Sequence, residues 1–358
     1  MFNLLKSDMY RLVHGKMLWV VTAIVVAASV LVVATMHAVS SPEFLSMTAS
    51  AVDMTVTACE DEGARGAASG DEAEGPAAFE ASVAAAAEAV EDVAENAAEA
   101  EEGAASGSAS AELWASVAED PQALSEADFE GVSREMRTFA TPADMLGDSV
   151  VSGGMLTLIV ALVATLFCAQ DFTTRFARNL VMDRRGRVRY YGEKIALVGV
   201  LAAFFLAVVS LTSVASFAVA GFTYQATNSL TDLLAFFGLT WLVIFAYGCS
   251  AAVIVWISRS AGAGVAWAIV VCSGFLGAVV GQVLLSLAVI APWFGALEPW
   301  LLSSCVQDLG AFAGVLLGTP AAAPLTMVPV AVQVLIVGAV AAGLCSALAL
   351  GVLRKRDL

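Results

Sequence analysis

The sequence predicts an all-α membrane protein that crosses the bilayer six times, and two observations carry this prediction. The first is a set of six long apolar runs, none of which contains Asp, Glu, Lys or Arg. A bilayer core about 30 Å thick needs about 20 apolar residues in a helix, and each run supplies that length. The second is that basic residues gather on alternate sides of the runs. The six predicted spans are residues 18–37, 151–170, 195–221, 233–257, 262–290 and 326–352.

Charge divides the chain into two unlike parts. The whole chain has a mean hydropathy of +0.83 and a net charge of −16. Residues 38–150 hold 25 acidic and 3 basic residues, whereas the rest of the chain holds 14 basic and 8 acidic ones. We therefore predict a large acidic insertion over 38–150 that is rich in Ala and Glu and partly disordered. Such a chain lacks the coherent basic face of a nucleic-acid-binding protein.

The bases outside the insertion define an orientation. They precede span one, lie between spans two and three and between spans four and five, and follow span six. All 14 fall on one side of the membrane if both termini are cytoplasmic, and the insertion is then extracellular. With Ala and Arg in excess over Lys, as in high-GC bacteria, the chain is predicted to be a multi-pass protein of a bacterial plasma membrane. Its predicted parts are residues 1–37, 38–150 and 151–358.

An amphipathic helix is predicted before the first span. Apolar residues recur at three- and four-residue spacing on one face, namely Phe2, Leu5, Met9 and Leu12. The bases Lys6, Arg11 and Lys16 lie off that face, which predicts an interfacial helix with its bases near lipid phosphates. The alternative is a simple basic flank. Span one is longer than a signal-peptide core and no Ala-x-Ala site follows it, so we expect it to be uncleaved.

The segments on the outer side carry helix signals. Thr141, Pro142 and Asp144 form a typical helix start, because Thr can cap, Pro fits the first position and Asp lies near the positive helix end. Trp293 and Trp300 suit the outer membrane interface. The glycines Gly310, Gly314 and Gly318 are spaced four apart. They predict a short helix that packs tightly or dips into the membrane, with a glycine-rich loop as the alternative.

Small and polar residues within the spans indicate helix packing. Span five carries Ser273, Gly277 and Gly281 four apart, a spacing that lets helix backbones approach closely, within this chain or at a subunit interface. Gln282 and Gln333 are the main polar side chains of the spans. We expect them to form hydrogen bonds between helices, with binding of a solute as the alternative. On the cytoplasmic side, we expect four residues to anchor the start of span three at the membrane interface, namely Arg189, Tyr190, Tyr191 and Lys194.

The chemistry that most enzymes need is missing from the sequence. No Gly-x-x-x-x-Gly-Lys-Ser/Thr phosphate loop occurs, and the two His residues lie at opposite ends of span one, which argues against a catalytic triad. The Cys residues are scattered singly, so no metal site is expected. No Asp, Glu, Lys or Arg lies within a predicted span, which argues against a proton- or sodium-coupled transporter. We therefore predict a protein that is not an enzyme and holds no cofactor of its own.

The cytoplasmic loop 171–194 presents a further pattern. Phe172, Phe176 and Leu180 lie four apart on one helical face, with Arg175, Arg178 and Asn179 beside them. An exposed apolar face flanked by bases is suited to docking into a groove of a partner, although it could also lie on the membrane.

The chain resembles the membrane subunits of ABC transporters of the ABC-2 type, particularly bacterial half-size permeases akin to lantibiotic-immunity permeases. The resemblance lies in the opening MFNLLKSDMYRLVHGKMLW, in Asp171-Phe172, Arg178-Asn179-Leu180 and Tyr190-Tyr191-x-x-Lys194, and in the closing Arg354-Lys355-Arg356-Asp357-Leu358. It covers about residues 1–40 and 140–358, and leaves 55–110 uncovered.

That resemblance implies a permease subunit of an ATP-driven exporter. A separate cytoplasmic ATPase subunit would hold ATP and Mg and would dock on a coupling helix. The docking residues implied here are Asp171, Phe172, Arg175, Phe176, Arg178, Asn179 and Leu180. Six spans are half of the usual twelve, so a second permease copy or paralogue is expected beside this chain in the lipid bilayer.

Two further interpretations remain open from the sequence. The chain is alternatively a non-transporting membrane scaffold or sensor that displays its acidic extracellular segment. The net charge of −22 over residues 38–150 would also attract cationic peptides as substrates, although a solvated acidic spacer explains it as well.

Overall fold

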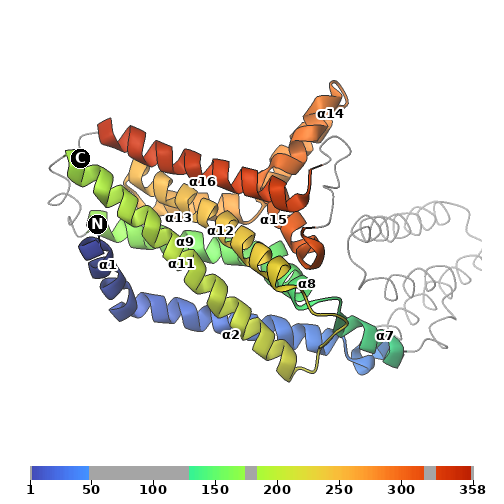
Figure 1. Cartoon of the computed structure of the whole chain (residues 1–358). Coiled ribbons are helices and arrows are strands. Elements are labelled where there is room, and N and C mark those ends of the chain that lie inside the picture. The colour runs from blue at the N-terminus through green and yellow to red at the C-terminus, as the bar shows by residue number, and fades with distance from the viewer. Residues whose placement is uncertain (1, 48–128, 174–183, 318–327, 356–358) are drawn as a thin grey trace, which may run out of the picture. The chain divides into compact units, whose positions relative to one another are not determined.

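The computed structural model describes residues 2–47, 129–173, 184–317 and 328–355. Four helices in this part of the chain are long and apolar enough to cross a membrane: α2 (Lys16–Val39), α11 (Arg184–Val219), α12 (Leu230–Ser258) and α16 (Val330–Lys355). Two bent helix pairs pass the same test when each pair is taken together, which raises the number of candidate spans to six. The structure therefore supports a helical, multi-pass membrane protein (Figure 1).

The chain separates into two compact units, each of which includes some residues outside the described ranges. Unit 1 consists of Met1–Val32, Thr141–Ser216 and Ala226–Leu358, and unit 2 of Val33–Ala140 and Phe217–Gln225.

Helix α12 is the centre of unit 1. It packs against α9 (Met155–Thr173), α13 (Ala261–Cys272) and α16 (Figure 1). Helix α12 is also linked to α11, because the Trp241 indole Nε1 donates to the Gly199 carbonyl at 2.9 Å. Apolar side chains and small residues thus fill the interior, as expected for helices that pack within a membrane.

Two of the predicted spans are broken rather than continuous. The second begins with α8 (Pro142–Leu146), where Thr141 accepts a hydrogen bond from the backbone of Asp144, which confirms the predicted helix start. It continues through the π-helical η1 (Gly147–Ser152) and then bends by 53° into α9. The fifth bends by 51° between α13 and α14 (Phe275–Ala288). Gly154 and Gly274 adopt positive φ angles at the two breaks, a conformation that only glycine adopts readily.

Three short helices follow α14. The 3-10 helix η2 (Pro292–Trp300) is followed by α15 (Leu302–Ala311) and by η3 (Ala313–Val315). Gly310 packs against Ser152 of η1, and the backbone N–H of Gly314 donates to Asp144 at 2.6 Å. A short helix with a close contact is therefore confirmed for Gly310 only, because α15 ends at Ala311 and Gly314 lies in η3. Gly318 lies outside the described residues.

Unit 2 adds a small feature that the sequence did not predict. Two-residue strands, β1 (Thr138–Phe139) and β2 (Thr223–Tyr224), pair in parallel after α7 (Phe129–Met136). The Phe139 ring packs edge-on against Phe217, with centroids 5.5 Å apart. Apart from this pairing, the described fold is helical.

Candidate functional site

A buried ion-pair network joins three helices of unit 1. The ammonium group of Lys194 on α11 lies 2.8 Å from a carboxylate oxygen of Asp8 on α1 (Phe2–His14) and 2.6 Å from one of Asp171 on α9. All three side chains are almost fully buried, with Lys194 and Asp171 at 1% exposure. Charges so deeply buried are stable only when they are paired, so these three residues fix the positions of their helices relative to one another.

Two more polar groups complete this ion-pair network. Arg11 on α1 lies 3.4 Å from the second carboxylate oxygen of Asp171, and the Tyr190 hydroxyl donates to Asp171 at 2.7 Å. The network therefore holds two carboxylates and two cations, a balance that avoids an uncompensated charge in the protein interior. The ammonium group of Lys194 also lies 4.4 Å from the centre of the Phe167 ring, a favourable cation–π distance.

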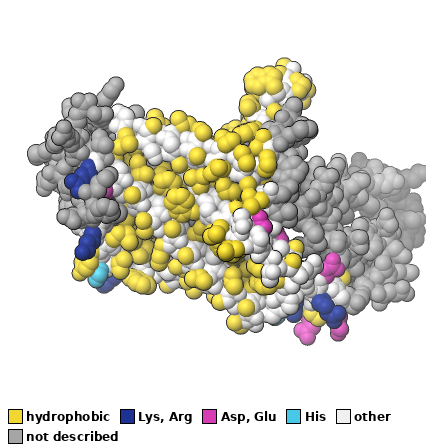
Figure 2. Space-filling view, in the orientation of Figure 1, with side chains coloured by type: hydrophobic (Ala, Val, Ile, Leu, Met, Phe, Trp, Pro, Cys, Tyr) yellow, Lys and Arg dark blue, Asp and Glu magenta, His cyan; other side chains and the backbone are white. Residues whose placement is uncertain are grey.

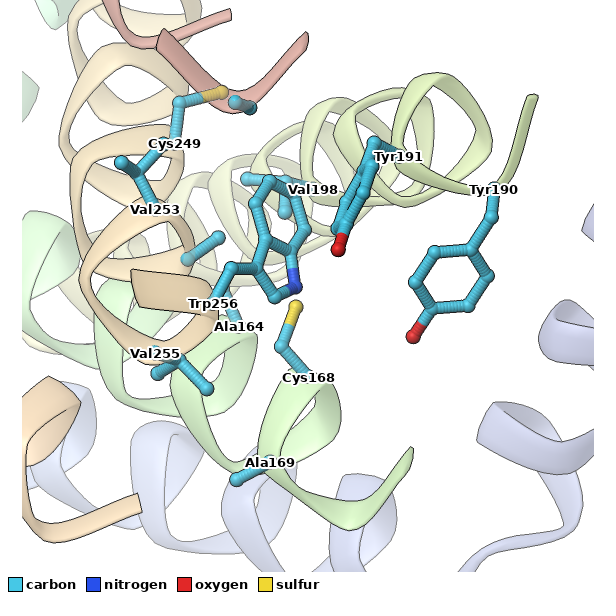
Figure 3. Packing of buried hydrophobic residues seen from close by; sticks show 12 residues of the cluster. Ala164, Cys168, Ala169, Tyr190, Tyr191, Val198, Cys249, Val253, Val255 and Trp256 are labelled. Carbon is cyan, nitrogen blue, oxygen red and sulfur yellow. The ribbon is translucent and has the colours of Figure 1, made fainter. Parts of the chain in front are cut away.

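Aromatic side chains shield one side of the network. Figure 3 shows the ring of Tyr191 between those of Tyr190 and Trp256, and the Tyr191 and Trp256 centroids are 5.0 Å apart. Cys168, one turn before Asp171, is buried in the same cluster. Tyr190 therefore links the network to a buried apolar cluster. Ion pairs are stronger in such low-dielectric surroundings, and breaking one costs more.

The structure corrects the predicted role of three residues at the start of span three. The sequence places Tyr190, Tyr191 and Lys194 at the membrane interface, but each is at most 2% exposed. These residues lie at the start of the candidate span Arg189–Val219, but their side chains are turned into the protein. The fourth predicted anchor, Arg189, is exposed. Tyr190 and Lys194 are four residues apart and therefore share a helix face directed at Asp171. That spacing was the available sequence signal for the network, together with Asp8, the only acid in the first 42 residues.

The predicted docking residues are only partly described. Asp171 and Phe172 belong to the last turn of α9, and Asp171 is occupied by the ion-pair network. The side chains of Arg175, Phe176, Arg178, Asn179 and Leu180 lie outside the described residues. Helix α9 extends into the predicted loop 171–194 as far as Thr173, and α11 begins at Arg184. Residues 174–183 lie between these two helices.

The predicted interface residues fall into different environments. Lys6 and Lys16 are exposed, whereas Arg11 points at Asp171 and Asp8 instead of standing away from the protein. Arg11 lies beside the face of α1 that turns Asp8 and Leu12 into the bundle. Its side chain is still 36% exposed, so its place at the membrane interface stays a prediction. Of the two residues predicted at the outer interface, Trp293 is 59% exposed and stacks on Phe294, and Trp300 is half-buried.

The predicted packing stripe of span five is interrupted. Ser273 lies at the end of α13 and Gly277 and Gly281 lie on α14, so the three residues do not share one continuous helix. Gly277 does allow close packing, since a Cβ there would overlap the side chain of Ser303 on α15. Gly281 is buried near Glu298 of η2. The contacts of these two glycines are therefore within this chain.

A second polar group lies near α15. The Gln333 side-chain amide on α16 donates to the Pro299 carbonyl at 2.5 Å and lies 3.5 Å from Asp308, so the expected bond between helices is confirmed for Gln333. Gln282 is exposed on α14. Burial, with a smaller contribution from Glu298, raises the pKa of Asp308 from 3.8 to about 6.

This raised pKa predicts a pH-dependent stability. The folded protein retains a proton on Asp308 that the unfolded chain releases between pH 3.8 and about 6, so the stability contributed here falls as the pH rises through that window. Asp308→Asn removes the titration and should flatten this part of the pH profile. We expect it to stabilise the protein at pH 7 by about 2 kcal/mol, measured by thermal unfolding in detergent. The exposed Glu130→Gln is the control and should leave the profile unchanged.

Comparison of the chain with protein-family models, with curated proteins and with solved structures finds no match. The class of protein is therefore defined by the fold and the site alone. It is a helical multi-pass membrane protein in which a buried ion-pair network joins α1, α9 and α11. Among the described residues, no group of three His, Cys, Asp or Glu is arranged to hold a metal ion.

Proposed function

We propose that this chain is the membrane-spanning permease subunit of an ABC-2 type exporter, powered by a separate cytoplasmic ATPase subunit. In this proposal each bent helix pair forms one span, which gives six spans with both termini in the cytoplasm of a bacterial cell. Residues 38–150 then form an acidic extracellular insertion. A second permease copy or paralogue completes the transport path.

One observation carries the proposal, namely the way in which the ion-pair network holds the ends of the predicted docking loop. Asp171 lies just before residues 174–183 and Lys194 follows them, and these two side chains are 2.6 Å apart at the ion pair. A force on the loop would therefore act on α9 and α11 together, and through Asp8 on α1 as well. This is the mechanical property that a membrane subunit needs if its energy comes from a partner bound to that loop.

The absence of an energy source in the sequence points the same way. The chain contains no phosphate loop with which to bind ATP by the common route. The ionisable residues of the network are held in ion pairs between helices, as expected for a joint rather than for an ion pathway. The ATP and Mg required for transport would both lie on the partner subunit.

Co-purification tests this proposal. A mild-detergent pull-down of the full chain from its native membranes should recover a subunit with ATPase activity, identified by mass spectrometry. Phe172→Asp with Phe176→Asp should abolish recovery of that subunit, because a charge replaces each apolar docking side chain. The matched control, Phe172→Tyr with Phe176→Tyr, keeps the aromatic face and should retain it.

The contrary outcome is equally definite. If repeated preparations contain no ATPase, the exporter proposal is wrong and the scaffold or sensor interpretation gains support. In that case deletion of residues 55–110 should abolish the cellular phenotype, whereas changes at Phe172 and Phe176 should not.

A further inference from the structure

Helix α1 exposes a face that differs from the one expected from the sequence. Most of its large exposed side chains are basic or aromatic, and they continue across the break at Gly15 into the first turn of α2. We call this set the basic face: Lys6, Tyr10, Val13, His14, Lys16 and Trp19. Tyr10 is 63% exposed and Trp19 is 60% exposed, so large aromatic rings are presented to the surroundings.

The protein itself fixes the direction in which the basic face points. On the opposite side of α1, Asp8 and Leu12 are buried, and Asp8 is paired with Lys194 at 2.8 Å. The angle between α1 and α2 is held by the Trp19 indole, whose Nε1 donates to the Val13 carbonyl at 2.7 Å. The basic face therefore cannot rotate into the bundle without breaking a buried ion pair.

We propose that the basic face binds the headgroups of anionic phospholipids in the leaflet next to the N-terminus. This inference goes beyond the exporter function and does not depend on it. It adds Tyr10, His14 and Trp19 to the interface residues expected from the sequence.

Charge complementarity supports a lipid phosphate as the ligand. Lys6 and Lys16 present ammonium groups, and Asp8, the only acid in the first 42 residues, is buried, so no exposed acid of this segment opposes an anion. His14 stacks on Tyr10 with centroids 3.9 Å apart, and its Nδ1 donates to the Tyr10 carbonyl at 3.0 Å.

Continuity with the membrane-facing surface supports a lipid over a soluble anion. The next exposed residues along α2 are apolar, with Val20 at 56% and Ile24 at 62% exposure. Figure 2 shows basic and His side chains beside a broad apolar surface at the α1 end of the molecule. A basic and aromatic band at the end of an apolar helix is the pattern expected where a membrane surface meets its hydrocarbon core.

Native mass spectrometry of the detergent-solubilised full chain tests the proposal with phosphatidylglycerol and phosphatidylcholine as probes. The wild-type chain should bind phosphatidylglycerol more tightly. Lys6→Gln with Lys16→Gln should weaken that binding about 30-fold. Each base near an anionic surface contributes a factor of about 5 to the affinity, and two are removed. Binding of phosphatidylcholine should change little. The same spectra report whether the variant is still folded.

Two controls make the test decisive. Lys6→Arg with Lys16→Arg keeps both charges and should retain the preference for phosphatidylglycerol. Arg259→Gln removes one exposed base elsewhere in unit 1 and should also retain it. Equal binding of both lipids by the wild-type chain would overturn the proposal, and so would an equal loss in the Arg259→Gln variant. Neither result would affect the exporter proposal, which is tested by co-purification.

Discussion

Replacing Lys194 by methionine is expected to destabilise the folded chain by about 3–5 kcal/mol, the range found when one partner of a buried ion pair is removed. The substitution roughly keeps the side-chain length but leaves Asp8 and Asp171 buried on either side of an uncharged group. In the wild-type protein each carboxylate lies within 2.8 Å of the Lys194 ammonium. Without that ammonium, the carboxylates of Asp8 and Asp171 would repel each other at short range. Arg11 would be the remaining cation of the network, and its nearest distances are 3.4 and 3.8 Å.

The protein is heated in detergent, and size-exclusion chromatography then measures the fraction that remains monodisperse. Lys16→Met is the matched control, because it exchanges the same residue types at an exposed position, and it should change stability by less than about 0.5 kcal/mol. The double variant Asp171→Asn with Lys194→Met removes one charge of each sign. It should recover part of the lost stability, because the opposite charges of the remaining Asp8 and Arg11 still balance.

A Lys194→Met protein as stable as the Lys16→Met control would show that the ion-pair network does not hold α1, α9 and α11 together. The observation that carries the exporter proposal would then be removed.

The sequence predicts the helices of this protein better than it predicts their breaks. Apolar runs and a capping Thr141 are local signals, so the membrane helices and the start at Pro142 could be located from residues alone. Gly154 and Gly274 could not be distinguished in advance from the other glycines of these spans. What makes them break points is a positive φ angle, which depends on the packing of the helices around them.

The ion-pair network could not be predicted because its members come from distant parts of the chain. Asp8 and Lys194 are 186 residues apart, and each taken alone looks like an ordinary charge near the end of an apolar run. Hydropathy places such residues in the interface, since a lone buried charge is costly. Only the three-dimensional arrangement shows that each charge has a partner, which makes burial possible.

The second large effect is expected at Gly147, where the backbones of η1 and α15 touch. Gly147 has φ −59° and ψ −54°, an ordinary helical conformation, so alanine would cause no backbone strain of its own. A Cβ there would nevertheless overlap the backbone carbonyl oxygen of Gly310 and lie 2.7 Å from the Cβ of Ala313. A backbone carbonyl cannot change rotamer, so the two helices would have to separate, and we expect Gly147→Ala to cost about 3 kcal/mol.

A matched glycine separates this steric effect from the general effect of adding a methyl group. Gly343 on α16 has no neighbouring atom within 4 Å of the position that a Cβ would occupy, so Gly343→Ala should leave the thermal stability unchanged or slightly raised. Combining Gly147→Ala with Ala313→Gly removes one of the two overlaps and should restore only part of the stability, because the Gly310 carbonyl remains. If Gly147→Ala were as stable as Gly343→Ala, the close contact between η1 and α15 would be disproved. The inference that α15 packs tightly against the broken second span would then be wrong.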